Sequence, residues 1–155
     1  MTRLLFALSV LLAVTGCNPG PTEKPGIDAL VGEYALSSES KKFLEDRKSY
    51  KSISRSVVTL RKDGTVSVTG LPDCYADPFD KGDNKFLTGQ GRWEIENTDF
   101  GYGITLTIED GGTLKAGIYH GSTILIKGRI PPFKLQFGIG DPDSDEFITY
   151  EKTNG

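Results

Sequence analysis

The chain has 155 residues, with 18 Lys and Arg residues against 21 Asp and Glu residues, and its formal net charge is −3. This length suits one domain with a sizeable core. The mildly acidic balance, with both signs of charge scattered along the chain, argues against a nucleic-acid partner and against electrostatic docking on anionic lipid.

The first seventeen residues have the organisation of a secretory signal, in which Arg3 precedes an apolar run over residues 4–14 and small residues precede Cys17. The run is too short to span a bilayer, which takes roughly 20 residues. Val14-Thr15-Gly16-Cys17 resembles the lipobox of bacterial lipoproteins, in which the cysteine receives a diacylglycerol and its freed amine a further acyl chain. The resemblance implies a signal peptide over residues 1–16 and a mature protein held in the membrane by lipid on Cys17.

Residues 17–28 are predicted to form a lipidated flexible tether, because prolines and glycines alternate there with polar residues. Asn18 stands where an aspartate would be the inner-membrane retention signal of some Gram-negative lipoproteins. The expected location is therefore the cell envelope, and in a Gram-negative organism the outer membrane, facing the periplasm.

Residues 29–155 are predicted to form a single all-β domain. Apolar and polar residues alternate over residues 65–69 and 104–109, which is typical of half-buried strands. Further strands are expected at residues 31–36, 55–60, 89–96, 114–119, 123–128, 133–139 and 146–151. Glycine-containing turns between them favour an antiparallel up-and-down meander, which forms a small barrel or a two-layer sandwich.

Two segments depart from the alternation. Residues 38–52 are rich in Lys, Glu and Asp and predict one short amphipathic helix. Residues 71–88 form a long connection of a kind that is often functional. Its aromatic and acidic side chains predict contacts with a protein partner, although a flap over the barrel end is the alternative; the candidate contacts are Tyr75, Asp77, Phe79, Asp80, Asp83 and Phe86.

Gly32-Glu33-Tyr34, followed by Leu60-Arg61-Lys62-Asp63-Gly64-Thr65 and Gly91-Arg92-Trp93-Glu94-Ile95, resembles lipocalin-type bacterial barrels. In such barrels an aromatic residue of the first strand closes one end beneath a basic residue near the last strand. The resemblance favours a lipocalin-like barrel over the sandwich and implies that Lys152 lies over Tyr34. It also implies an apolar ligand. Tyr34 replaces the usual tryptophan, and no arginine follows the last strand.

No pattern in the sequence points to catalysis or to a cofactor. His120 is the only histidine, and no nucleophile-elbow motif accompanies it. If Cys17 is acylated, Cys74 is the only remaining thiol, so a zinc site and an intramolecular disulfide are not expected. A carboxylate pair for glycoside or peptidoglycan hydrolysis is the remaining enzymatic alternative, but nothing selects one pair. We therefore expect a protein that is not an enzyme.

A calcium site is one interpretation of the acidic run near the C-terminus. Asp141, Asp143 and Asp145 alternate, as the oxygen ligands of a calcium loop do. Glu146 and Lys152 stand where an EF-hand has Gly and Glu, and a polar turn between strands is the alternative interpretation.

The leading functional hypothesis is a membrane-anchored envelope lipoprotein whose non-catalytic β-domain binds a protein, as periplasmic inhibitors and immunity proteins do. The alternative is a lipocalin-like carrier of a lipid or another apolar small molecule. Phe133, Leu135, Phe137 and Ile139 share one face of a strand. They fill the core under the first hypothesis and line a ligand cavity under the second.

Overall fold

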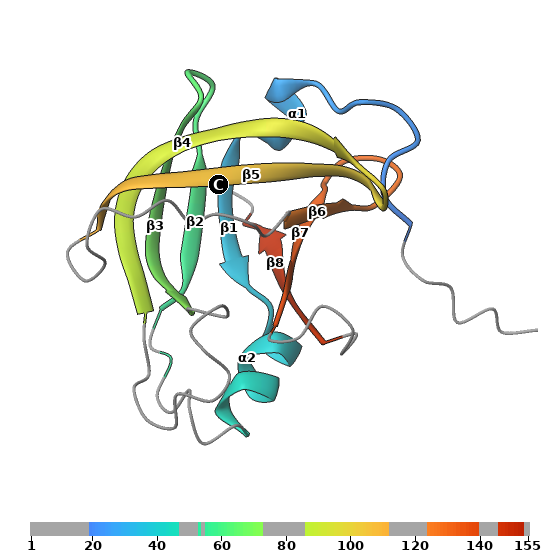
Figure 1. Cartoon of the computed structure of the whole chain (residues 1–155). Coiled ribbons are helices and arrows are strands. Elements are labelled where there is room, and N and C mark those ends of the chain that lie inside the picture. Colours follow the sequence, from blue (N-terminus) through green and yellow to red (C-terminus); the bar gives the residue numbers. More distant parts are fainter. Residues whose placement is uncertain are drawn as a thin grey trace, which may run out of the picture.

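The computed structural model describes residues 19–46, 53, 55–72, 86–111, 124–139 and 146–153. Within these ranges the strands form a closed antiparallel barrel in chain order, from β1 to β8 (Figure 1). The last strand pairs with the first, which closes the barrel. The predicted up-and-down meander is confirmed, as a barrel rather than a sandwich. The strands are β1 (Gly32–Leu36), β2 (Val57–Leu60), β3 (Thr65–Pro72), β4 (Phe86–Thr98), β5 (Gly101–Gly111), β6 (Ile124–Lys127), β7 (Lys134–Gly138) and β8 (Phe147–Lys152).

Each of these strands overlaps a predicted one, whereas the strand predicted at residues 114–119 lies outside the described residues. The β4–β5 hairpin is longer than the alternation indicated and curves across the barrel (Figure 1). Its register shifts between Gln90 and Gly91. A Cβ atom at position 91 would collide with the carbonyl oxygen of Thr107. Glycine therefore permits the close approach of the two strands at this bulge.

The described core residues lie inside the barrel. Strand alternation turns one face of each strand inward, as in β3, where Val66 and Val68 are buried and Thr65 is not. A side chain without accessible surface borders no space large enough for a water molecule, so the described inward-facing residues that are fully buried pack without such gaps. Those that are at most 1% exposed are Tyr34, Val58, Leu60, Val66, Val68, Leu71, Ile104, Leu106, Ile124, Ile126, Leu135, Phe137, Ile148 and Tyr150.

One end of the barrel is covered by α1 (Ile27–Leu30), a short helix that the sequence did not predict. The Tyr34 hydroxyl donates a hydrogen bond to the carbonyl oxygen of Leu30 at 2.8 Å. Lys152 Nζ lies 6.0 Å from the centroid of the Tyr34 ring and donates to the carbonyl oxygen of Ala29 at 3.1 Å. Gly32 makes room for it, because a Cβ there would lie 2.6 Å from Lys152 Cε. Lys152 thus lies where the lipocalin resemblance implied a basic residue.

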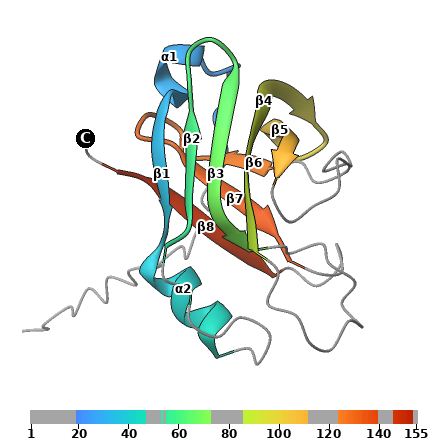
Figure 2. The same ribbon diagram turned by 90° about the vertical axis from the view of Figure 1, so that its left-hand side faces the viewer.

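We call this the α1 end. In a meander every second connection lies at the same end, so the β2–β3, β4–β5 and β6–β7 turns belong to it. The opposite end, the α2 end, carries α2 (Ser38–Glu45) (Figure 2). The other interstrand connections start and finish there. The helix is capped by Ser37, whose Oγ accepts from the Ser40 backbone N–H at 3.2 Å. It ends earlier than the predicted residue 52, and residues 47–52 lie outside the described ranges.

The described part of the predicted tether packs on the barrel. Pro21 and Pro25 are buried, and the Gly128 N–H donates to the carbonyl oxygen of Pro19 at 3.0 Å. A Cβ at Gly20 would lie 2.9 Å from the carbonyl oxygen of Ile126. A proline-rich composition indicates flexibility, but a proline ring loses almost no side-chain entropy when it is buried. Over the described residues this segment therefore differs from the free linker that its composition predicts.

Candidate functional site

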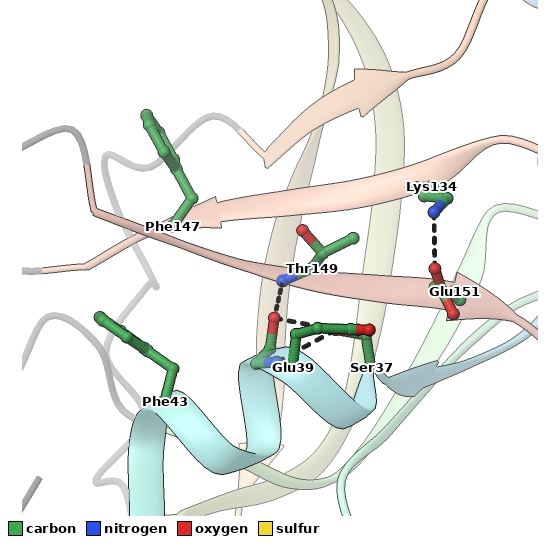
Figure 3. Close-up of a pocket in the computed structure, with 8 residues that line it drawn as sticks. Ser37, Glu39, Phe43, Lys134, Phe147, Thr149 and Glu151 are labelled. Atoms are coloured by element: carbon green, nitrogen blue, oxygen red, sulfur yellow. Dashed lines mark hydrogen bonds and ion pairs between the residues drawn. The ribbon is translucent and has the colours of Figure 1, made fainter. Parts of the chain in front are cut away.

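An open pocket of about 340 Å³ lies on the outer wall of the barrel, between α2 and strands β7 and β8 (Figure 3). It is separate from the core, because strand alternation in β8 points Ile148 and Tyr150 inward and the intervening residues outward. The pocket is lined by Ser37, Glu39, Ser40, Phe43, Lys134, Phe147, Thr149 and Glu151.

One part of the pocket is charged. Lys134 of β7 and Glu151 of β8 are paired residues in the antiparallel register. Their side chains form an ion pair, in which Lys134 Nζ lies 2.6 Å from Glu151 Oε1. Both side chains are roughly half exposed, so the pair orients two charges at the surface and adds little to stability.

The other part of the pocket is aromatic. Phe147 begins β8 and keeps 40% of its surface exposed. Phe43 of α2 is half-buried and packs against the edge of the core. Figure 3 shows both rings on the side of the pocket away from the Lys134–Glu151 pair. The pocket therefore offers apolar surface and charge side by side, a combination that protein-binding surfaces use.

Two serines hold α2 in place against β8. Ser40 Oγ accepts a hydrogen bond from the Thr149 backbone N–H at 2.8 Å, and the Ser37 N–H donates to the Thr149 carbonyl oxygen at 2.9 Å. The β1–β8 ladder ends at the Leu36–Tyr150 pair, so these bonds satisfy the backbone groups of the next β8 residue. They fix the helix that carries Phe43, and thereby one wall of the pocket.

Glu39 adds a second carboxylate at the rim. A hydrogen bond from its own backbone N–H lowers its pKa, and hydrogen bonds from the Ser37 and Ser38 side chains and the charge of Lys134 act in the same direction. Glu39 is fully exposed and stays ionised at neutral pH. With Glu39 and Glu151 against Lys134, the lining carries a net negative charge. It suits a partner group that combines a cation with apolar surface.

Of the six residues predicted to contact a partner, the structure describes Phe86. It begins β4, pairs with Pro72 of β3 and packs, partly buried, against the core. Pro72 and Phe86 lie at the α2 end. The connection between them therefore starts and finishes at the same end as the aromatic part of the pocket. The other predicted partner residues lie outside the described residues, as does the lipidation site; they are Tyr75, Asp77, Phe79, Asp80, Asp83 and Cys17.

The predicted calcium ligands Asp141, Asp143 and Asp145 also lie outside the described residues. The connection that contains them is closed at its base by a hydrogen bond from the Ile139 N–H to the carbonyl oxygen of Glu146 at 2.8 Å. Glu146 directly precedes Phe147, so this acidic connection joins the barrel beside the aromatic part of the pocket. Within the described ranges, no three His, Cys, Asp or Glu residues are grouped closely enough to hold a metal ion.

Sequence reasoning missed the pocket, although one signal was present. In β8 the outward positions are occupied by Phe147, Thr149 and Glu151, and a phenylalanine on a polar face is an exception to the alternation. Phe43 gave no comparable signal, because any amphipathic helix carries apolar residues.

Among the residues that the structure describes, no helix has the length and apolar character needed to cross a membrane. No protein-family model, no curated protein and no solved structure matches this chain.

Proposed function

We propose that the chain is a cell-envelope lipoprotein, anchored by lipid on Cys17, whose non-catalytic β-domain binds a protein partner through the pocket beside α2. The observation that carries this proposal is the close packing of the described inward-facing side chains. Tyr34, Phe137 and Tyr150 are the largest of the inward-facing side chains with almost no exposed surface, and the rings of Phe137 and Tyr150 pack with centroids 4.9 Å apart.

A carrier of apolar molecules needs an internal volume of roughly 300–1,000 Å³ for a ligand of ordinary size. An apolar cargo between the described strands would have to displace several of these core side chains. Each displacement would forfeit roughly 1.5–3 kcal/mol of burial. Binding on the outer surface requires no such rearrangement, which favours a partner over a cargo.

The chemistry of the pocket supports a protein partner. Phe43 and Phe147 offer apolar surface, and Glu39 and Glu151 offer negative charge around them. A basic or aromatic side chain that enters such a pocket is the kind of anchor on which protein interfaces depend. The predicted contacts Asp77, Asp80 and Asp83 belong to the connection between Pro72 and Phe86, which starts and finishes at the α2 end.

Capture from envelope extract tests the proposal. The full-length protein is immobilised beside two variants, Phe147→Ala in the pocket and Phe100→Ala in the β4–β5 turn of the α1 end, where Phe100 is 80% exposed. We expect one captured protein, with at least about tenfold weaker binding for Phe147→Ala, since an interface anchor contributes roughly 2 kcal/mol. Phe100→Ala should bind normally.

Two results would contradict the proposal. Equal capture by both variants would place the partner elsewhere on the barrel. A lipid in the native mass spectrum of the purified protein, with no captured protein, would favour the carrier.

A further inference from the structure

The N-terminal segment is attached to a defined place on the barrel, which is strand β6 and the turn that follows it. The Gly128 N–H donates to the carbonyl oxygen of Pro19 at 3.0 Å, Gly20 lies against the backbone of Ile126, and Pro21 is buried. From there the segment runs to α1 (Figure 1).

This attachment limits how far the barrel can be from the lipid anchor. Cys17 precedes Pro19 by two residues, and two residues span at most about 7 Å in any conformation. The acyl chains on Cys17 would enter the bilayer close to the β6–β7 turn. The turn must then lie at the membrane surface, whereas a free tether over residues 17–28 would have allowed any orientation.

The composition of the turn suits that position. Arg129, Ile130, Pro131 and Pro132 are all exposed, and 76% of the Ile130 surface is accessible. Within the described residues, no carboxylate forms an ion pair with Arg129 or with Lys127 at the end of β6. An exposed apolar side chain flanked by cations is the arrangement that inserts between lipid headgroups.

The local charge also differs from that of the whole chain. Residues 124–139 contain Lys127, Arg129 and Lys134 and no Asp or Glu, although the net charge of the chain is −3. Lys134 is paired with Glu151 on the outer wall, which leaves two cations at the turn. The acidic overall composition predicted no attraction to anionic lipid, and the folded chain brings these cations to the anchored side.

We propose that the β6–β7 turn is a second membrane contact, in which Ile130 enters the headgroup region of the bilayer and Lys127 and Arg129 contact lipid phosphates. This inference rests on the proposed lipid anchor at Cys17. Together, the anchor and the turn give the barrel one orientation, with the α1 end toward the bilayer and with α2 and the aromatic part of the pocket away from it.

Fluorescence quenching by brominated phospholipid tests the contact. Full-length lipidated protein is reconstituted into vesicles of phosphatidylcholine and phosphatidylglycerol, with or without bromine on the acyl chains. Ile130→Trp places a reporter in the turn, and Lys42→Trp places a matched reporter on exposed α2. The single native tryptophan, Trp93, is only 6% exposed, and the unsubstituted protein supplies its background.

We expect the fluorescence of Ile130→Trp to be shifted to the blue and to be quenched several-fold more strongly than that of Lys42→Trp. Circular dichroism spectra matching the unsubstituted protein show that both variants are folded. If mass spectrometry shows acylated Cys17 but the two reporters are quenched equally, the proposed second contact is contradicted and the proposed lipid anchor is supported. If Cys17 carries no lipid, the proposed anchor and the contact fail together.

Discussion

The two ends of the barrel are built differently. At the α1 end, short turns, α1 and the N-terminal segment with its buried Pro21 and Pro25 cover the barrel, and the paired residues Tyr34 and Lys152 join the first and last strands. At the α2 end, a single helix docks on the outer wall beside an open pocket, and the longer connections begin and end there. Function in β-barrels concentrates in long connections on a rigid scaffold. We therefore propose that the α1 end holds the domain together and positions it, while the α2 end binds the partner.

The largest expected effect concerns the closed end. Leu30 of α1 is fully buried, so Leu30→Ala should lower the free energy of unfolding by about 2–5 kcal/mol. Ile27→Ala, in the same helix at 49% exposure, should change it by less than about 0.5 kcal/mol. Urea denaturation of both variants measures the difference. Similar losses in the two variants would mean that α1 does not seal this end.

Alkaline pH should also weaken the closed end. Burial raises the pKa of Tyr34 from 10.0 to about 12. Below about pH 10 the tyrosine is protonated in both the folded and the unfolded chain, and its full contribution to the free energy of unfolding is present. Between about pH 10 and 12 only the unfolded chain ionises, so stability falls with rising pH, by roughly 3 kcal/mol in total.

Tyr34→Phe isolates this contribution. The variant should lose about 1 kcal/mol at neutral pH, because the hydrogen bond to the Leu30 carbonyl oxygen is missing. Its stability should then fall less steeply than that of the unsubstituted protein in urea titrations above about pH 10. Parallel pH profiles for the two proteins would show that Tyr34 is not the group responsible.

At the α2 end, Ser40, whose side chain accepts a hydrogen bond from β8, should matter more than the exposed Ser38. Ser40→Ala removes the acceptor of the Thr149 N–H, and Ser40 is 6% exposed, so we expect a loss of about 1–2 kcal/mol. Ser38→Ala, exposed in the same helical turn, should be nearly neutral. Thermal melts of both variants compare them. Identical melting temperatures would mean that α2 is not fixed to β8 by this bond.

The smallest effect belongs to the charged part of the pocket. A double-mutant cycle with Lys134→Ala and Glu151→Ala should give a coupling energy of about 0.2–1 kcal/mol that decreases as salt is added. A larger coupling that is insensitive to salt would show that the pair has a structural role. We propose instead that these two charges contribute to partner binding.

The strands and the core could be predicted because they depend on local pattern. Alternation placed Leu135 and Phe137 on one strand face, and both are buried in the barrel. The packing of residues 19–28 against the barrel could not be predicted, because a free linker and a segment that packs through two prolines can have the same proline and glycine composition. The hydrogen bond to Pro19 and the burial of Pro21 and Pro25 distinguish the two.

The pocket could not be predicted either, because it depends on contacts between residues that are far apart in the sequence. Ser40 and Thr149, whose hydrogen bond fixes α2, are 109 positions apart in the sequence, and no local pattern relates them. The ion pair between Lys134 and Glu151 depends on the β7–β8 register in the same way. Sequence reasoning instead pointed to conspicuous clusters such as Asp77, Asp80 and Asp83.

Site-specific photocrosslinking in intact cells tests the difference between the two ends most directly. A benzophenone amino acid replaces Phe147 in one full-length variant and Ile130 in another. We expect a discrete protein adduct from position 147, no protein adduct from position 130, and lipid attached at position 130. A protein adduct from position 130 with none from position 147, or the same adducts from both, would contradict this expectation.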